Sequence, residues 1–102
     1  MQRVTVVRYT TKPEHTAENE ALSRAVFARL HATPPAGVAY ALFQDGNEFT
    51  HVFLNLKADE SAPVTDLPVF KAFETGILER CEVPPKATRV AANLVEYYGF
   101  AK

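Results

Sequence analysis

Hydrophobic and polar positions follow two different periodicities along this chain, and the changes between them predict six elements. Four runs rich in β-branched and aromatic side chains predict strands: residues 4–10, 38–44, 48–56 and 87–98. Apolar side chains three to four positions apart predict one helix over residues 13–32 and a second from residue 66 or 67 to about residue 80–82. The polar, proline-containing residues 57–65 are typical of a mobile loop.

The order of these elements, β-α-β-β-α-β, predicts one domain over residues 1–102. Strands and helices in this split arrangement favour a ferredoxin-like α+β sandwich, a four-stranded antiparallel sheet with two helices on one face. Asp45 and Gly46 stand between the two middle strands, and this dipeptide is a strong hairpin signal. The second and third strands are therefore expected to be antiparallel neighbours.

Both faces of the predicted sheet are apolar. In the third strand, Phe49 and Phe53 point to one face while Val52 and Leu54 point to the other. Two helices cover only one face, and a large exposed apolar surface usually marks an interface. We therefore expect a homodimer formed through the open sheet face, because most soluble homo-oligomers are two-fold dimers. The alternative is a monomer whose aromatic side chains partly cover that face.

Composition and charge exclude several other partners. Eleven Lys and Arg against twelve Asp and Glu give a net charge of −1, so neither a nucleic acid nor an anionic membrane is an expected partner. No apolar run approaches the length of a membrane span. Cys81 is the only cysteine, which excludes a disulfide within the chain and favours the cytoplasm. The three histidines lack metal-ligand spacing, so we expect no metal and no cofactor.

One titratable side chain stands in the middle of an otherwise apolar strand. His51 lies between Phe49 and Phe53, where an apolar residue is the usual choice. With Tyr40 and Asn55 it gives a mostly aromatic surface carrying three polar groups, which is typical of a small-ligand pocket. We take His51 as the candidate catalytic base and the other four residues as candidate substrate-binding residues. The alternative is a structural histidine, hydrogen-bonded at the interface.

The hairpin register decides whether Tyr40 meets His51. A two-residue turn at Asp45-Gly46 places Tyr40 directly opposite His51, on the sheet face away from the helices. The alanines on either side of Tyr40 would then face the helices and let them approach. A three-residue loop with a bulge at Gly46 would instead remove Tyr40 from this face.

Arginines in the outer strands form a second set of candidate ligand-binding residues. Arg8 and Arg89 lie among apolar residues, and either could hold a ligand carboxylate through its two-pronged donor geometry. In the predicted last strand, Asn93 and Tyr97 share a face with Arg89. The alternative is that such an arginine pairs with a carboxylate at the rim of the interface.

The whole chain resembles the dimeric α+β barrel superfamily, and within it the antibiotic biosynthesis monooxygenase-like proteins. The resemblance rests on the element order, the length and the apolar second sheet face. It also rests on a Lys-Pro-Glu helix start at residues 12–14 after a strand containing Tyr9, and on the spacing of Phe70 and Phe73. It implies two sheets packed face to face in a dimer, a pocket between sheet and helices, and cofactor-independent monooxygenase activity.

The chain lacks the residues that the family typically uses for its chemistry. Members that oxidise without a cofactor typically carry a Trp on a central strand and a His near the second helix, and haem-degrading members use a His on that helix. This chain has no Trp, and residues 62–81 contain no His. The sequence therefore leaves two functions open: a monooxygenase-like or proton-transfer enzyme acting on a small apolar or aromatic molecule, and a non-catalytic dimeric ligand-binding or structural module.

Overall fold

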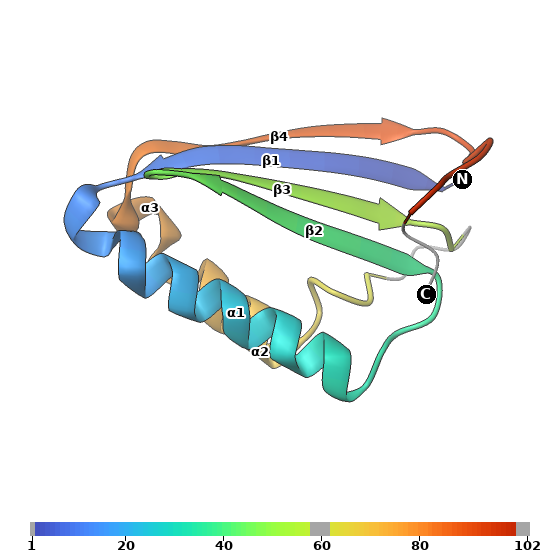
Figure 1. The fold of residues 1–102 in the computed structure, drawn as a ribbon, viewed down its shortest axis with the longest axis horizontal. Helices are drawn as coiled ribbons and strands as arrows, with labels where there is room; N and C mark the ends of the chain where they lie inside the picture. The colour runs from blue at the N-terminus through green and yellow to red at the C-terminus, as the bar shows by residue number, and fades with distance from the viewer. Residues whose placement is uncertain (1, 58–61, 100–102) are drawn as a thin grey trace.

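The fold is known from a computed structural model that describes residues 2–57 and 62–99 (Figure 1). Its elements in chain order are β1 (Arg3–Thr11), the 3-10 turn η1 (Pro13–His15), α1 (Thr16–Ala32), β2 (Val38–Asp45), β3 (Glu48–Asn55), α2 (Pro68–Glu74), α3 (Ile77–Arg80) and β4 (Cys81–Ala91). The strands form one antiparallel sheet in the order β2-β3-β1-β4. Helices α1 and α2 lie on the same side of it (Figure 1). The predicted ferredoxin-like α+β fold is confirmed.

The helix predicted over residues 13–32 is divided into η1 and α1. Pro13 begins η1, where its missing N–H costs nothing, and Glu18 in the first turn of α1 places negative charge at the positive end of the helix dipole. Arg29 and His31 lie in the last turn, where a positive charge is favoured. None of the helices in the described ranges has the length and apolar character needed to cross a membrane. Residues 58–61 of the predicted mobile loop lie outside the described residues.

The single second helix predicted from the apolar spacing is wrong. It is broken into α2 and α3 at Thr75 and Gly76, because Gly76 adopts a left-handed φ of 79° that ends the first helical segment. A Cβ at Gly76 would meet no atom closer than 3.7 Å, so the backbone angle, and not crowding, requires the glycine.

We predict that Gly76→Ala lowers the free energy of unfolding by about 1 kcal/mol, because an L-residue in the left-handed region costs about that much. Urea denaturation followed by circular dichroism measures the change. Glu79→Ala, an exposed position on α3, is the matched control and should move the midpoint far less. Equal stability of Gly76→Ala and the native chain would contradict the assigned role of this glycine.

The last strand was also misplaced. β4 covers Cys81–Ala91 instead of residues 87–98, and it accommodates Pro84 and Pro85 because it is an edge strand paired only with β1. The strand ends at Ala91 because that residue pairs with Arg3, the first residue of β1. Beyond it, the backbone N–H of Ala92 donates to the carbonyl oxygen of Gln2 at 2.9 Å, directly before β1 begins.

The hairpin register differs from the predicted one by two residues. Asp45 pairs with Glu48, so the turn residues are Gly46 and Asn47 and not Asp45 and Gly46. A positive φ of 61° at Gly46 fits the first position of such a turn. Leu42 therefore lies opposite His51, and Tyr40 lies opposite Phe53. Since side chains alternate with a period of two, Tyr40 stays on the same face as His51.

The face that carries His51 points toward the helices, which reverses the predicted orientation of the sheet. The ring centroid of Phe73 in α2 lies 5.5 Å from that of His51, and Phe27 in α1 stacks on Tyr40 at 4.4 Å. The large rings fill the space between sheet and helices, while the small alanines of β2 lie on the open face. That open face is still apolar, with these residues: Val4, Val6, Ala39, Ala41, Phe43, Val52, Leu54 and Val90.

Candidate functional site

A pocket of about 540 Å³ lies between the sheet and α2. Strands β1, β3 and β4 line one side of it, and residues 62–65 with α2 line the other. Its apolar lining includes Val7, Phe53, Val64, Phe70, Phe73 and Ile77. Its polar lining includes Arg3, Thr5, Tyr9, His51, Asn55, Glu74 and Arg89. A small volume that is mostly apolar, with a few polar groups, is typical of a site for a small molecule.

His51 lies in the wall of this pocket and is hydrogen-bonded through both ring nitrogens. Its Nε2 lies 2.7 Å from the hydroxyl of Tyr9, and its Nδ1 lies 2.6 Å from the hydroxyl of Tyr40. Only 2% of the residue is exposed. The short distances and the burial hold the imidazole in one orientation, with a tyrosine at each nitrogen.

The hydrogen bonds continue from Tyr9 into the helices. Asn19 of α1 donates from Nδ2 to the hydroxyl of Tyr9 at 2.9 Å, and it accepts at Oδ1 from Nε of Arg80 at 3.1 Å. The result is a buried chain of five side chains, which we call the polar chain: Arg80, Asn19, Tyr9, His51 and Tyr40. It crosses the layer between helices and sheet.

Arg80 sets the direction of the polar chain. A guanidinium only donates, so the amide of Asn19 must turn its oxygen toward Arg80 and its nitrogen toward Tyr9. The Tyr9 hydroxyl accepts from Asn19 and lies 2.7 Å from Nε2 of His51, so donating its proton to that nitrogen gives the buried hydroxyl both a donor and an acceptor. In this arrangement the neutral imidazole carries its proton on Nδ1 and donates from there to Tyr40. The contact with Arg80 on α3 favours this tautomer because it orients the amide of Asn19.

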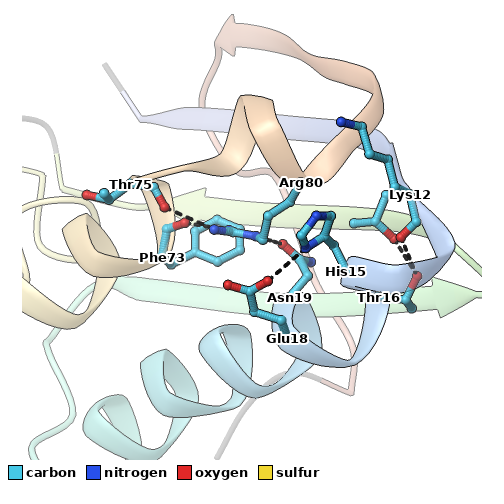
Figure 2. Close-up of polar contacts among 9 residues, drawn as sticks. Lys12, His15, Thr16, Glu18, Asn19, Phe73, Thr75 and Arg80 are labelled. Carbon is cyan, nitrogen blue, oxygen red and sulfur yellow. Dashed lines mark hydrogen bonds and ion pairs between the residues drawn. The ribbon is translucent and has the colours of Figure 1, made fainter.

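Arg80 is itself held by the carbonyl groups at the helix break. It is 4% exposed and donates to the carbonyl oxygens of Phe73 at 2.6 Å and of Thr75 at 3.0 Å, while its guanidinium lies 5.4 Å from the centre of the Phe73 ring (Figure 2). These carbonyls end α2 and have no helical partner. One side chain thus satisfies the end of a helix and also begins the polar chain.

Burial keeps Tyr9, His51 and Tyr40 of the polar chain uncharged. Desolvation lowers the pKa of His51 to about 4, because the cationic form has no water around it. Desolvation is also the main cause that raises the pKa of Tyr9 to about 12, and it raises the pKa of Tyr40 as well. All three groups are consequently neutral near pH 7.

The structure places the predicted site residues in three different ways. His51, Phe53 and Asn55 line the pocket. Tyr40 reaches His51 by a hydrogen bond, and its ring stacks on Phe53 with a centroid distance of 4.2 Å. Phe49 is 1% exposed, stacks on Tyr9 at 5.4 Å and does not line the pocket.

Tyr9, Asn19 and Arg80 were not recognised as site residues in the sequence. Arg80 is 61 positions from Asn19, and Tyr9 is 42 positions from His51, so no local pattern joins them. A signal was present nevertheless. Asn19 precedes the buried residues Ser23 and Val26 at helical spacing, and Arg80 follows Phe73 and Ile77 in the same way. A polar residue in register with an apolar helical stripe marks a buried polar contact.

The described residues contain no group of three or more His, Cys, Asp or Glu side chains that could hold a metal ion. Cys81 begins β4 and is buried. Burial raises the pKa of the Cys81 thiol, which disfavours the thiolate. The side chains of the pocket offer groups for hydrogen bonding and proton transfer, among them Tyr9 and His51.

Comparison with known proteins gives matches only among solved structures. No family model and no curated protein matches this chain. A Caulobacter crescentus protein, a candidate antibiotic biosynthesis monooxygenase, superimposes with a TM-score of 0.72 at 19% identity, over 89% of each chain. Rv0793 from Mycobacterium tuberculosis gives 0.72 at 18% identity, over 96% of this chain and 100% of its own. An antibiotic biosynthesis monooxygenase gives 0.68 at 21% identity, over 90% and 98%.

These structures have the ferredoxin-like fold of the single chain that the sequence predicts. The chain shares its fold, over nearly its whole length, with proteins of the antibiotic biosynthesis monooxygenase-like group. Sequence identities near 20% support a shared fold but not a shared activity, because proteins with one fold catalyse many different reactions. The function must therefore be argued from the pocket itself.

Proposed function

We propose that this protein is a homodimer that binds a small apolar or aromatic molecule in the pocket between the sheet and α2. The observation that carries this proposal is a cavity of about 540 Å³ with aromatic walls and a few polar groups. The fold shared with monooxygenase-like proteins supports it. A cytoplasmic location belongs to the same proposal, on the ground of the lone, buried Cys81.

The chemistry that fits this pocket is proton transfer through Tyr9 and His51. Both side chains line the cavity, and the hydroxyl oxygen of Tyr9 lies 2.7 Å from Nε2 of His51. A bound molecule with an acidic proton would give it to Tyr9 as Tyr9 gives its own to His51. This route needs no movement of the buried imidazole, and it uses the tautomer of His51 in which Nε2 carries no proton.

A second candidate function is ligand binding without catalysis. His51 is 2% exposed, and both of its nitrogens already have partners. Burial also lowers its pKa to about 4, which makes it a weak base. In this alternative the polar chain only orders the wall of the pocket.

An enolisable aromatic ketone separates the two functions. We expect the protein to accelerate hydrogen–deuterium exchange at the acidic carbon of 2-tetralone in D₂O, measured by NMR. A positioned general base contributes about a hundredfold or more, so His51→Gln should lose about that factor. Glutamine keeps donors and acceptors for the two tyrosines but has no basic nitrogen.

Binding of 2-tetralone is measured in parallel by thermal shift. Bound ketone with exchange at the solution rate would eliminate proton transfer and leave the non-catalytic function. His31→Gln is the control variant, because His31 is exposed in the last turn of α1. It should exchange like the native protein.

The dimer part of the proposal rests on the open sheet face. Phe43 is 59% exposed and Val90 is 50% exposed, although both belong to a continuous apolar surface that no helix covers. Val52 and Val6 pair at the centre of this surface. Apolar area on this scale is typical of a surface covered by a second copy of the chain.

We predict that the native protein sediments as a dimer at micromolar concentration and that Val52→Lys sediments as a monomer. A lysine ammonium buried between two apolar sheets is not paired, so the dimer should weaken about a hundredfold or more. Ala25→Lys, on an exposed position of α1, should remain dimeric. A folded native monomer at this concentration would contradict the proposed assembly.

A further inference from the structure

Two arginines stand beside each other at one end of the pocket. Arg89 of β4 pairs with Thr5 of β1, while Arg3 lies two residues before Thr5 and pairs with Ala91. Thr5 also pairs with Phe53 of β3, so Arg3, Thr5 and Arg89 are on the same sheet face as His51, which points to the helices, and all three line the cavity. In an antiparallel pair such diagonal neighbours are within reach of each other for long side chains.

The structure distinguishes between the arginines that the sequence offered. Arg8 lies on the opposite sheet face from Arg89, because Arg8 is an odd number of positions from Thr5 along β1. Asn93 and Tyr97 follow the end of β4 at Ala91, so they do not share a strand face with Arg89 as the sequence predicted. The polar residues next to Arg89 on the same sheet face are Thr5 and Arg3.

The described residues of the pocket lining include two guanidinium groups, those of Arg3 and Arg89, and one carboxylate, that of Glu74. Tyr9 and His51 are neutral near pH 7, since burial raises the pKa of the first and lowers that of the second. Within the described residues, the guanidinium of Arg89 makes no hydrogen bond or ion pair. Arg89 therefore has donors available for an anionic group of a ligand.

The apolar side chains lie along the rest of the cavity. Phe53, Phe70 and Phe73 provide aromatic walls, with Val7 and Ile77 beside them. A molecule that fills this space and contacts Arg89 would have an apolar or aromatic body and an anionic group. Of the common anions, a carboxylate matches the planar donor fork of an arginine.

We propose that the pocket binds aromatic carboxylates, with the carboxylate group at Arg89 and Thr5, supported by Arg3, and the ring against the phenylalanines. This inference rests on the proposed small-molecule function and narrows it to one ligand class. Arg89 is the residue that selects the anion, because it comes from the exposed edge strand and keeps its donors available. The body of the ligand then extends toward Tyr9 and His51.

Isothermal titration with two probes of the same shape tests the ligand class. We expect 2-naphthoate to bind about tenfold or more tightly than its neutral amide, 2-naphthamide, at pH 7 and low salt. In Arg89→Gln the affinity for 2-naphthoate should fall about tenfold while the affinity for 2-naphthamide stays constant. Arg8→Gln is the matched control: it removes the same charge from the other sheet face and should leave both affinities unchanged.

The outcomes separate this inference from the function on which it rests. Equal binding of the two probes, or an unchanged affinity of Arg89→Gln for 2-naphthoate, would overturn the carboxylate site while the pocket remained a binding site. An equal loss in Arg8→Gln would also overturn it, because the effect would then come from overall charge. Failure of the native protein to bind either probe would overturn both proposals.

Discussion

Arg80→Met should lower the free energy of unfolding by about 3–5 kcal/mol, the largest effect that we expect from a single substitution in this protein. The substitution keeps the apolar stem but leaves three acceptors without their donor: Asn19 Oδ1 and the carbonyl oxygens of Phe73 and Thr75. Each buried polar group without a partner costs about 1–3 kcal/mol. Urea denaturation of the variant at pH 7 measures the loss.

Arg24→Met is the matched control for this prediction. Arg24 also lies on a helix, but it is exposed and pairs with Glu20 at 2.7 Å across one turn of α1. Exposed ion pairs of this kind contribute about 0.3–0.5 kcal/mol, so the control should unfold close to the native midpoint. If Arg80→Met were as stable as the control, the guanidinium would not hold the helix break together.

The architecture was predictable because it depends on local periodicity. β-branched runs predict the limits of the first three strands to within one or two residues, and Pro13 marks the start of η1, the turn that leads into α1 at Thr16. The errors concern element limits that are set by pairing between strands far apart in the sequence. β4 begins at Cys81 because Thr11 of β1 is available as its partner, and it ends where β1 begins. Neither limit of β4 can be predicted from the composition of residues 81–98 alone.

The candidate site was only partly predictable, for a related reason. His51 was identifiable as a polar residue in an apolar strand. A register error of two residues leaves Tyr40 and His51 on the same sheet face, so this part of the prediction was unaffected. Which face points to the helices depends on side-chain volume. The space beneath the helices takes the rings of Tyr40, which stacks on Phe27, and of Phe53, which meets Phe70 edge to face. Sequence periodicity identifies two faces, but it does not say which one the helices cover.

The second large effect concerns pH and comes from His51. Its pKa is about 4 in the folded protein and about 6.5 when the chain is unfolded. Between these pH values His51 is protonated in the unfolded state but not in the folded state. The free energy of unfolding therefore decreases as the pH falls through this window. A difference of about 2.5 pKa units corresponds to about 3 kcal/mol lost between pH 7 and pH 4. Above pH 6.5 the contribution of His51 is complete.

We predict that His51→Gln removes this component of the pH dependence. The native protein and the variant both lose stability in acid through their carboxylates, so the difference between the two unfolding curves isolates His51. That difference should change by about 3 kcal/mol between pH 7 and pH 4. His31→Gln, which removes an exposed histidine, should follow the native curve throughout. Parallel curves for His51→Gln and the native protein would mean that the imidazole takes up its proton without leaving the two tyrosines.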